Sequence, residues 1–425
     1  MLKVFGKGLL LAAGGAGAGA VVYYRNDLPQ LQYDAAGAAG SFLKLLDAER
    51  AHDVGVWLAQ KQLFPRDSRP DPPSLQTRVW GRDFSNPIGL AAGFDKNAEA
   101  MEGLLGLGFG FIEVGTITPL PQGGNPKPRV FRLPELSATI NRCGFNSKGV
   151  DAANVNLLNY RLKLIRDHSE LARSKVEDQT GTPDQLTRSA GLVAVNLGKN
   201  KICEDPAADY CVGVTKLGPF ADFIVINVSS PNTPGLRALQ GKKELEKLMR
   251  RVKATRDGME WGERGPPPLL IKMAPDVDGP GRADIAALTI RLGLDGLVVG
   301  NTTISRPLQV QAHPTGAEEG GLSGQPLMDL STEVLKDMYR HTRGRVPLVG
   351  CGGVCSGEDA YRKIRAGASL VELWTSMAYE GPALVPRLKR ELAECLERDG
   401  FKSVEEAVGA DLPEEEVKSW WRSWF

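Results

Sequence analysis

The sequence predicts an α/β protein whose main domain is a closed (β/α)8 barrel, the TIM-barrel architecture. From about residue 86 onward, apolar runs alternate with polar loops and helical stretches. The runs number eight, which fits a barrel of parallel strands, whereas a six-stranded doubly wound sheet would leave two of them unused. A last helical stretch follows the eighth run, so the alternation is complete.

The predicted strands are short, continuously apolar runs, as expected for parallel strands that are buried on both faces. They cover residues 88–92, 111–118, 192–197, 223–228, 269–274, 296–303, 346–350 and 369–376. Helical stretches lie between them, the clearest at 243–256, 282–292, 330–342, 358–366 and 383–398. The long gap between the second and third runs is expected to hold a hairpin around 129–141 and a polar surface insertion, 167–189.

The composition argues against several classes of function. The formal net charge is +1, from 52 basic and 51 acidic residues, so nothing favours nucleic acid as a partner. The six cysteines are scattered, and neither a second pair nor histidines complete a zinc site beside Cys351 and Cys355, so we expect free thiols and no metal. The four histidines lie in unrelated surroundings, which argues against a Ser-His-Asp hydrolase.

Residues 8–24 form an uncharged run near the start of the sequence. Lys3 and Lys7 precede it, Arg25 follows it, and two tyrosines stand at its end. The run is just long enough to cross a bilayer core, and tyrosines suit its interface, so we predict a single membrane span. A cleaved signal peptide and an amphipathic transit segment are the alternatives. Acidic residues are absent before Asp27, as in an import signal, so residues 1–27 are assigned to targeting and anchoring.

Residues 36–64 predict two short amphipathic helices between the anchor and the barrel. The apolar faces comprise Phe42, Leu45 and Leu46 in the first helix and Val54, Trp57, Leu58 and Phe64 in the second. Pro65 ends the second helix, and a linker rich in Pro, Asp and Ser follows. The pair is either a small cap on the barrel or lies on a membrane beside the anchor. We therefore divide the chain into 1–27, a helical domain with its linker at 28–72, and the barrel at 73–425.

Polar side chains collect at the predicted carboxyl ends of the strands, where a barrel has its active site. The densest group, 227–233, follows the fourth run, and Pro231 makes the backbone leave the sheet there. Because an amide offers both a donor and an acceptor, recurring amides suit a ring with alternating N–H and C=O groups, such as a pyrimidine. Five asparagines recur in this way: Asn141, Asn196, Asn227, Asn232 and Asn301.

Two further features suit a charged ligand. Lys96 and Lys272 offer one cation for a carboxylate and one for an electron-rich reduced ring. Glycines after the seventh run and a hydroxyl after the eighth predict a phosphate cup built from backbone N–H groups, to which Gly324 can contribute.

Four segments, 86–96, 140–146, 227–233 and 321–324, closely resemble dihydroorotate dehydrogenase. More narrowly, the chain resembles the class 2, quinone-dependent, mitochondrial type, because Ser230 stands where class 1 enzymes carry cysteine and because helices and an anchor precede the barrel. The resemblance covers roughly residues 38–410. It implies an FMN-containing barrel that oxidises (S)-dihydroorotate to orotate in UMP biosynthesis and passes the electrons to ubiquinone. It also implies a single-pass protein of the mitochondrial inner membrane.

The resemblance also implies roles for individual residues. Ser230 becomes the catalytic base, and His52 and Arg132 are expected to line a quinone tunnel. The residues implied to hold the substrate are Lys96, Asn141, Arg142, Cys143, Gly144, Phe145, Asn227, Asn232, Asn301 and Thr302. Those implied to hold FMN are Ala91, Ala92, Thr116, Asn141, Asn196, Asn227, Lys272, Gly300, Gly324, Gly353, Trp374 and Thr375.

Two positions depart from the usual pattern of the family: Gly300 replaces a threonine and Trp374 replaces a tyrosine. Trp374 is expected near the quinone, so the change bears on quinone preference. Because serine is a weak base and no histidine stands in the motifs, Ser230 is expected to act through hydrogen-bonded water. The alternatives are another FMN-dependent β/α-barrel dihydropyrimidine oxidoreductase, which would lack the anchor, and a non-catalytic membrane-bound barrel, which would lose the reacting side chains.

Overall fold

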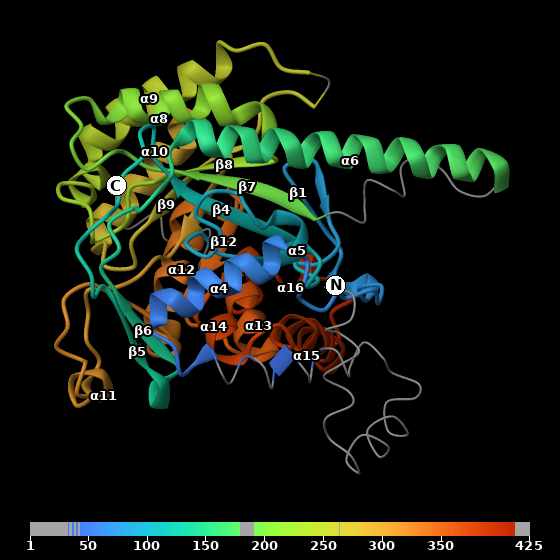
Figure 1. Cartoon of the computed structure of the whole chain (residues 1–425). Helices are drawn as coiled ribbons and strands as arrows, with labels where there is room; N and C mark the ends of the chain where they lie inside the picture. The colour runs from blue at the N-terminus through green and yellow to red at the C-terminus, as the bar shows by residue number, and fades with distance from the viewer. Residues whose placement is uncertain are drawn as a thin grey trace.

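The computed structural model describes residues 43–178, 191–262 and 264–412, together with 33, 36, 37 and 40. The predicted anchor and the division at residue 27 lie outside these residues. Within the described part of the chain, no helix has both the length and the apolar character needed to cross a membrane. Figure 1 shows the arrangement of the elements, with the barrel strands at the centre and helices around them.

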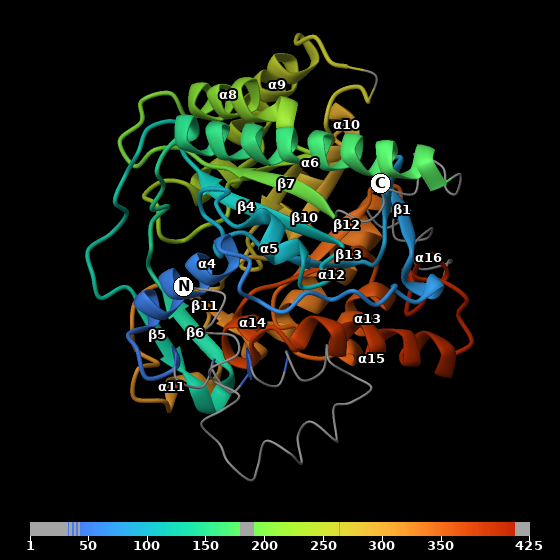
Figure 2. The same cartoon turned by 45° about the vertical axis from the view of Figure 1, so that its right-hand side comes forward.

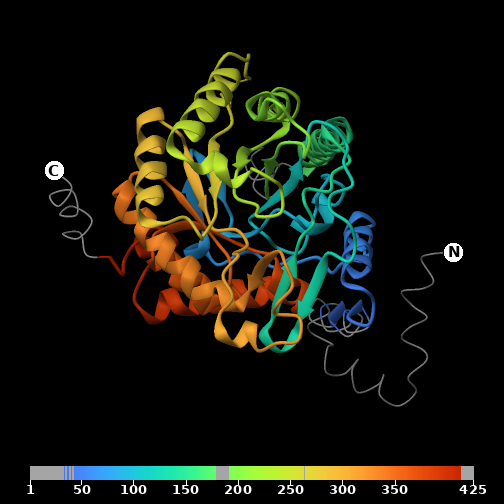
Figure 3. The same cartoon turned by 90° about the vertical axis from the view of Figure 1, so that its left-hand side faces the viewer.

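Eight parallel strands close into the predicted barrel, in the spatial order β10-β12-β13-β3-β4-β7-β8-β9. β13 pairs with β3 in parallel and so closes the ring. Figure 3 shows the strands ringed by helices. All eight apolar runs are confirmed as strands: β3 (Ile88–Leu90), β4 (Phe111–Ile117), β7 (Leu192–Leu197), β8 (Phe223–Asn227), β9 (Leu269–Met273), β10 (Gly296–Val299), β12 (Leu348–Cys351) and β13 (Ala368–Leu373).

The helices pack apolar faces on the outside of the barrel. α13 (Gly357–Arg365) begins at a capping box formed by Ser356 and Asp359, and α10 (Gly279–Leu292) ends at Gly293 in the left-handed conformation. The five helices predicted most clearly are confirmed within a few residues. Besides α10 and α13, the described helices that follow α4 (Ala48–Gln60) are α5 (Met101–Leu105), α6 (Val150–Asp178), α8 (Pro206–Leu217), α9 (Lys242–Asp257), α11 (Leu308–Gln311), α12 (Met328–Thr342), α14 (Thr375–Glu380), α15 (Leu384–Arg398) and α16 (Val404–Ala407). Short 3-10 turns cover Pro73–Leu75, Pro134–Leu136, Gly218–Phe220, Arg237–Gln240 and Gln325–Leu327.

The helix α6 differs from the expectation, since it continues to Asp178 through half of the predicted insertion. Its first turns are anchored by buried side chains such as Leu157, and no glycine or proline interrupts the sequence before Gly181. Figure 1 shows α6 reaching past the edge of the barrel. The rest of the insertion, 179–190, lies outside the described residues.

A hairpin closes the amino-terminal end of the barrel. β1 (Thr77–Val79) and β2 (Arg82–Phe84) pair in antiparallel register. Phe84 packs edge-on against Phe111, and Trp80 lies 5.1 Å, between ring centroids, from Phe223. Phe111 and Phe223 begin their strands, so this aromatic cluster plugs one end and leaves the carboxyl end for the site.

A second, three-stranded sheet stands at the carboxyl end. β5 (Val130–Leu133) and β6 (Ala138–Asn141) form the predicted hairpin, and β11 (Gly321–Gly324) pairs with β6. The strand β11 was not predicted, because glycine has a low preference for strands. α4 (Ala48–Gln60), the second of the two predicted N-terminal helices, packs on α5 and beside β5. Figure 2 shows α4 next to this sheet. Most of the first predicted helix lies outside the described residues, although residues 33, 36, 37, 40 and 43 are helical.

Candidate active site

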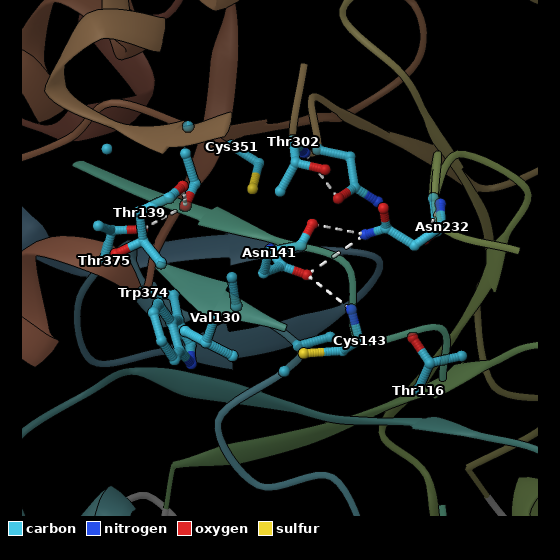
Figure 4. Close-up of a pocket in the computed structure, with 18 of the residues that line it drawn as sticks. Thr116, Val130, Thr139, Asn141, Cys143, Asn232, Thr302, Cys351, Trp374 and Thr375 are labelled. Carbon is cyan, nitrogen blue, oxygen red and sulfur yellow. Dashed lines mark hydrogen bonds between the residues drawn. The ribbon is translucent and has the colours of Figure 1, made fainter. Parts of the chain in front are cut away.

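A cavity opens at the carboxyl ends of the barrel strands and extends to α4 and β6. Strand β8 brings Asn227 to it, β9 brings Lys272, and the loop after β8 brings Ser230. Figure 4 shows Asn141 near the centre of the cavity wall, bonded to Asn232 and Cys143. Most of the predicted residues therefore converge on one cavity, as the parallel order of the strands requires.

The amides form a connected network rather than isolated caps. Asn227 Nδ2 donates to Thr116 Oγ1 at 3.0 Å, and Thr116 Oγ1 donates to Asn196 Oδ1 at 2.6 Å. Asn301 Nδ2 donates to Ser229 Oγ at 2.7 Å, and that hydroxyl donates to Asn227 Oδ1 at 2.9 Å. Each amide is thus oriented before a ligand binds, which favours recognition of a ring with fixed donors and acceptors.

The centre of the barrel holds a charged triad. Lys272 Nζ donates to Glu113 Oε2 at 2.5 Å and to Glu372 Oε2 at 3.2 Å, and all three side chains are buried. Burial and the neighbouring Glu113 raise the pKa of Glu372 to about 8. Burial tends to raise the pKa of Glu113, but the charge and hydrogen bond of Lys272 outweigh burial and hold this pKa below its ordinary value. The two carboxyl groups are thus shifted in opposite directions, so that near neutral pH Glu113 favours the carboxylate and Glu372 the protonated form.

An arginine fixes the loop that carries Ser230. Arg237 donates to Ser229 O at 2.8 Å and to Thr302 O at 2.9 Å, and its other nitrogen pairs with Asp276 at 2.8 Å. These bonds tie together the ends of β8, β9 and β10. Ser230 Oγ accepts a bond from Asn232 N at 3.3 Å. Among the described residues, neither a histidine nor a carboxylate is bonded to Ser230.

Lys96 and His52 meet on the α4 side of the cavity. His52 Nε2 lies 2.7 Å from Phe94 O and 3.5 Å from Lys96 Nζ. If Nε2 carries a proton, it donates that proton to Phe94 O. In that tautomer Nε2 cannot also accept a hydrogen bond from Lys96 Nζ. Burial and the nearby Lys96 lower the pKa of His52, and burial lowers that of Lys96. Trp374 lies 6.2 Å, between ring centroids, from His52 and makes this wall aromatic.

The opposite end of the cavity is lined by glycines and hydroxyls. Gly324 and Gly353 have φ values of +99° and +85°, which side chains rarely adopt. A Cβ on Gly353 would also lie 2.3 Å from Met328 Cα. Thr375 Oγ1 donates to Ser323 Oγ at 2.9 Å beside these glycines. Backbone N–H groups can therefore approach a ligand closely here, as in a phosphate site.

Four predicted residues do not line the cavity. Asn196 lies behind Thr116 and donates to Glu113 Oε1 at 2.6 Å. At Gly300 (φ +123°) a Cβ would lie 2.1 Å from Cys351 O, which leaves no space for a side chain. Arg142 pairs with Glu318 at 2.7 Å outside the cavity, and Arg132 donates to Lys44 O and Leu46 O next to the start of α4.

Sequence reasoning missed several residues of the site. Glu113 and Glu372 are the most important, and a lone acidic residue inside each apolar strand was the available signal. Glu49 of α4 also lines the cavity and pairs with Arg129 through two bonds, of 3.1 and 2.6 Å, which ties α4 to the loop before β5. Gly352 belongs to the glycines after the seventh run that were expected to form the phosphate cup. The other lining residues that received no role from the sequence are Ala48, Gly93, Val130, Thr139, Asn146, Ser323, Leu327, Cys351, Val354, Leu373 and Ser376.

Three buried polar atoms of the lining have no hydrogen-bond partner within the described structure. They are Glu372 Oε1, Asn146 Oδ1 and Trp374 Nε1. Buried polar atoms normally find partners, so these three atoms leave hydrogen-bonding capacity for a ligand with polar atoms. A flavin with a phosphate tail fits this lining, because amides and a lysine stand at one end and the glycine cup at the other.

Comparisons with known proteins agree with this geometry. A family described as "Dihydroorotate dehydrogenase" matches residues 74–396. A protein from Oryza sativa subsp. japonica named dihydroorotate dehydrogenase (quinone), mitochondrial, is 60% identical over 87% of this chain and 78% of its own. A mouse protein of the same name is 49% identical over 87% and 88%. The crystal structure of DHODH from Eimeria tenella in complex with ferulenol superposes with a TM-score of 0.78 at 43% identity, covering 86% of this chain and 96% of that one.

Proposed function

The chain belongs to the dihydroorotate dehydrogenase family, and we propose that its cavity holds FMN between a dihydroorotate site and a path for ubiquinone. As a quinone-dependent member, it is a flavin-dependent oxidoreductase that oxidises dihydroorotate to orotate in pyrimidine biosynthesis. The observation that carries the proposal is the convergence of Lys96, the amide network and the Lys272 triad on one cavity. A bound flavin supplies the two-electron chemistry that links dihydroorotate to a quinone.

For the cofactor we propose that the glycine cup takes the phosphate and that Lys272 faces the ring. The ammonium group of Lys272 is held charged by Glu113, so it offers a fixed positive charge to an electron-rich ring. Thr116, Asn196 and Asn227 support that end of the site through their connected hydrogen bonds.

The substrate lies, in this proposal, between Lys96 and the asparagines. Lys96 pairs with the carboxylate of dihydroorotate, and the amides of Asn141, Asn227, Asn232 and Asn301 bond to the ring. The network already fixes the donors and acceptors of these amides, so little ordering is needed when the ring binds.

Ser230 is our proposed base, because it lines the cavity on a loop that Arg237 holds in place. It takes the C5 proton, which is acidified by the adjacent carbonyl group. Serine needs activation to act as a base, and no side chain of the described residues is placed to give it. We therefore propose that Ser230 passes the proton on through hydrogen-bonded water.

The acceptor route is proposed along α4. His52, Phe94 and Trp374 form an aromatic wall on that side, and exposed Leu45, Leu46 and Trp57 lie on or next to α4. Relatives named as mitochondrial support a mitochondrial location. We propose further that the apolar run within residues 1–27 anchors the protein in the inner membrane and that 28–72 admits the quinone.

The flavin released by the purified protein tests the cofactor assignment. Heat denaturation should release FMN, identified by chromatography and mass, in about equal amount to the protein. Release of FAD or riboflavin, or a colourless folded protein, would contradict the proposal.

A further inference from the structure

Lys363 lies in α13 with its side chain fully buried against the barrel. Its Nζ donates to Ser331 Oγ at 2.8 Å and to Thr332 Oγ1 at 3.2 Å, two hydroxyls of α12. Within the described residues, no carboxylate lies at ion-pair distance from this ammonium group. A buried cation without a counter-charge is costly, so its position calls for a negative partner.

Ser331 connects Lys363 to the glycine loop after β12. The Ser331 hydroxyl is placed to donate to two carbonyl oxygens, Gly352 O at 3.0 Å and Met328 O at 3.1 Å from Oγ. Gly352 and Gly353 line the cavity, whereas Ser331 does not. In a trans peptide the C=O and the next N–H point to opposite sides. The bond from Ser331 to Gly352 O therefore turns the N–H of Gly353 away from α12 and toward the cavity side.

The packing around this connection leaves little freedom. A Cβ on Gly350 would lie 3.1 Å from Lys363 Cδ, so the lysine stem passes directly behind β12. Met328, at the start of α12, touches Gly353 closely, as described above. Lys363, Ser331 and the glycine loop thus form one packed unit behind the phosphate cup.

Charged and titratable groups of α12, α13 and β12 act on Lys363. Those with the largest electrostatic influence on it, within the described residues, are Cys351 of β12, Asp359 and Arg362 of α13, and Asp329 of α12. Burial is the main influence and lowers the pKa of Lys363 to about 7. Burial also raises the pKa of the Cys351 thiol to about 12, so that group stays neutral near pH 7.

We propose that Lys363 is a positioning residue for the phosphate end of the flavin site, an inference that rests on the proposed function. Through Ser331 it aims the Gly353 N–H at the phosphate, and it places a buried positive charge behind the cup. The phosphate, a dianion above its second pKa of about 6, supplies the missing counter-charge. Bound phosphate and protonated Lys363 therefore stabilise each other, and binding takes up a proton when the lysine is neutral.

Flavin affinity measures this coupling directly. The full chain, stripped of flavin, is titrated with FMN and with riboflavin, which lacks the phosphate, while flavin fluorescence is followed. Lys363→Met should weaken FMN binding about tenfold and leave riboflavin binding unchanged. Between about pH 7 and pH 9 the wild-type affinity for FMN should fall as Lys363 loses its proton, whereas the Lys363→Met affinity should not.

Two further variants separate this role from a merely structural one. Lys389→Met is the matched control, because Lys389 is a buried lysine of α15 that is paired with Asp67 and Asp71 at 2.8 and 2.6 Å. It should lower stability but keep the preference for FMN over riboflavin. Ser331→Ala keeps the lysine but loses the bond to Gly352, so it should weaken the binding of FMN and not that of riboflavin. This variant also tests the inference if Lys363→Met does not fold.

An FMN-to-riboflavin preference that stays at the wild-type value in Lys363→Met and Ser331→Ala would overturn the inference and leave the proposed function intact. A wild-type protein that binds neither flavin would overturn the proposed function itself.

Discussion

Lys272 and Glu113 form an ion pair of 2.5 Å at the centre of the barrel, with side-chain exposures of only 4% and 0%. Lys272→Met would leave Glu113 as a buried carboxylate without its counter-charge, so the free energy of unfolding should fall by about 3–5 kcal/mol. Urea denaturation of the flavin-free protein measures this change. Lys216→Met, at an ion pair with the exposed Asp151, is the control and should cost less than about 1 kcal/mol. Equal effects of the two substitutions would contradict the account of the triad.

Glu372 predicts a pH dependence of stability. In the folded protein its pKa is raised to about 8, whereas the ordinary value is 4.5. The carboxyl group of Glu372 binds its proton more tightly in the folded than in the unfolded state, so its protonation stabilises the fold. This contribution to the free energy of unfolding is complete below about pH 4.5 and is lost as the pH rises through about 8. The free energy of unfolding of the flavin-free wild type should therefore fall between about pH 5 and pH 8 relative to Glu372→Gln. If the free energies of unfolding of the two proteins change in parallel over this pH range, Glu372 is already ionised in the folded wild type and its pKa is not raised.

Ser230→Ala should keep the flavin and the fold but slow flavin reduction by dihydroorotate roughly 10²-fold or more, the usual effect of losing a general base. Ser230→Cys should retain part of the rate, because a thiolate can accept a proton. The neighbouring Ser229→Ala is the contrast: Ser229 only orients Asn227 and Asn301, so it should raise the dihydroorotate requirement more than it lowers the limiting rate. Stopped-flow absorbance measures both. A wild-type rate in Ser230→Ala would exclude this residue as the base.

Lys96→Met should weaken dihydroorotate binding about tenfold or more, because a bound carboxylate would lose its charge-assisted hydrogen bond. The dihydroorotate dependence of flavin bleaching gives the affinity. Lys148→Met is the control, since Lys148 is exposed and paired with Glu99 at 2.7 Å, and it should leave the affinity unchanged. If both variants bind dihydroorotate like the wild type, Lys96 does not hold the carboxylate.

The barrel could be predicted from the sequence because parallel strands buried on both faces need continuous apolar residues, and all eight such runs form strands. Several elements escaped the pattern, among them β11 and the polar end of α6. The glycine-rich β11 is a strand only because β6 offers it a pairing edge. The polar end of α6 is helical because the helix continues from buried residues such as Leu157 and meets no breaker.

The cavity residues were predictable where they follow strands, since closure of the barrel brings those positions together. The side chains that pair with one another inside the barrel could not be predicted in this way. Lys272 lies 159 and 100 residues from Glu113 and Glu372, and only the closed ring places the three side chains in contact. Lys363 and Ser331 belong to two different helices, and their contact depends in the same way on how those helices pack.

One cavity oxidises dihydroorotate and, in our proposal, passes the electrons through a flavin to a quinone. Anaerobic stopped-flow absorbance tests it most directly, with the purified flavin-loaded protein mixed first with dihydroorotate and then with a short-chain ubiquinone analogue, NAD or fumarate. We expect dihydroorotate to bleach the flavin and the quinone to restore its absorbance rapidly, whereas NAD and fumarate should not restore it. A flavin that dihydroorotate does not bleach, or that recovers with NAD or fumarate and not with the quinone, would contradict it.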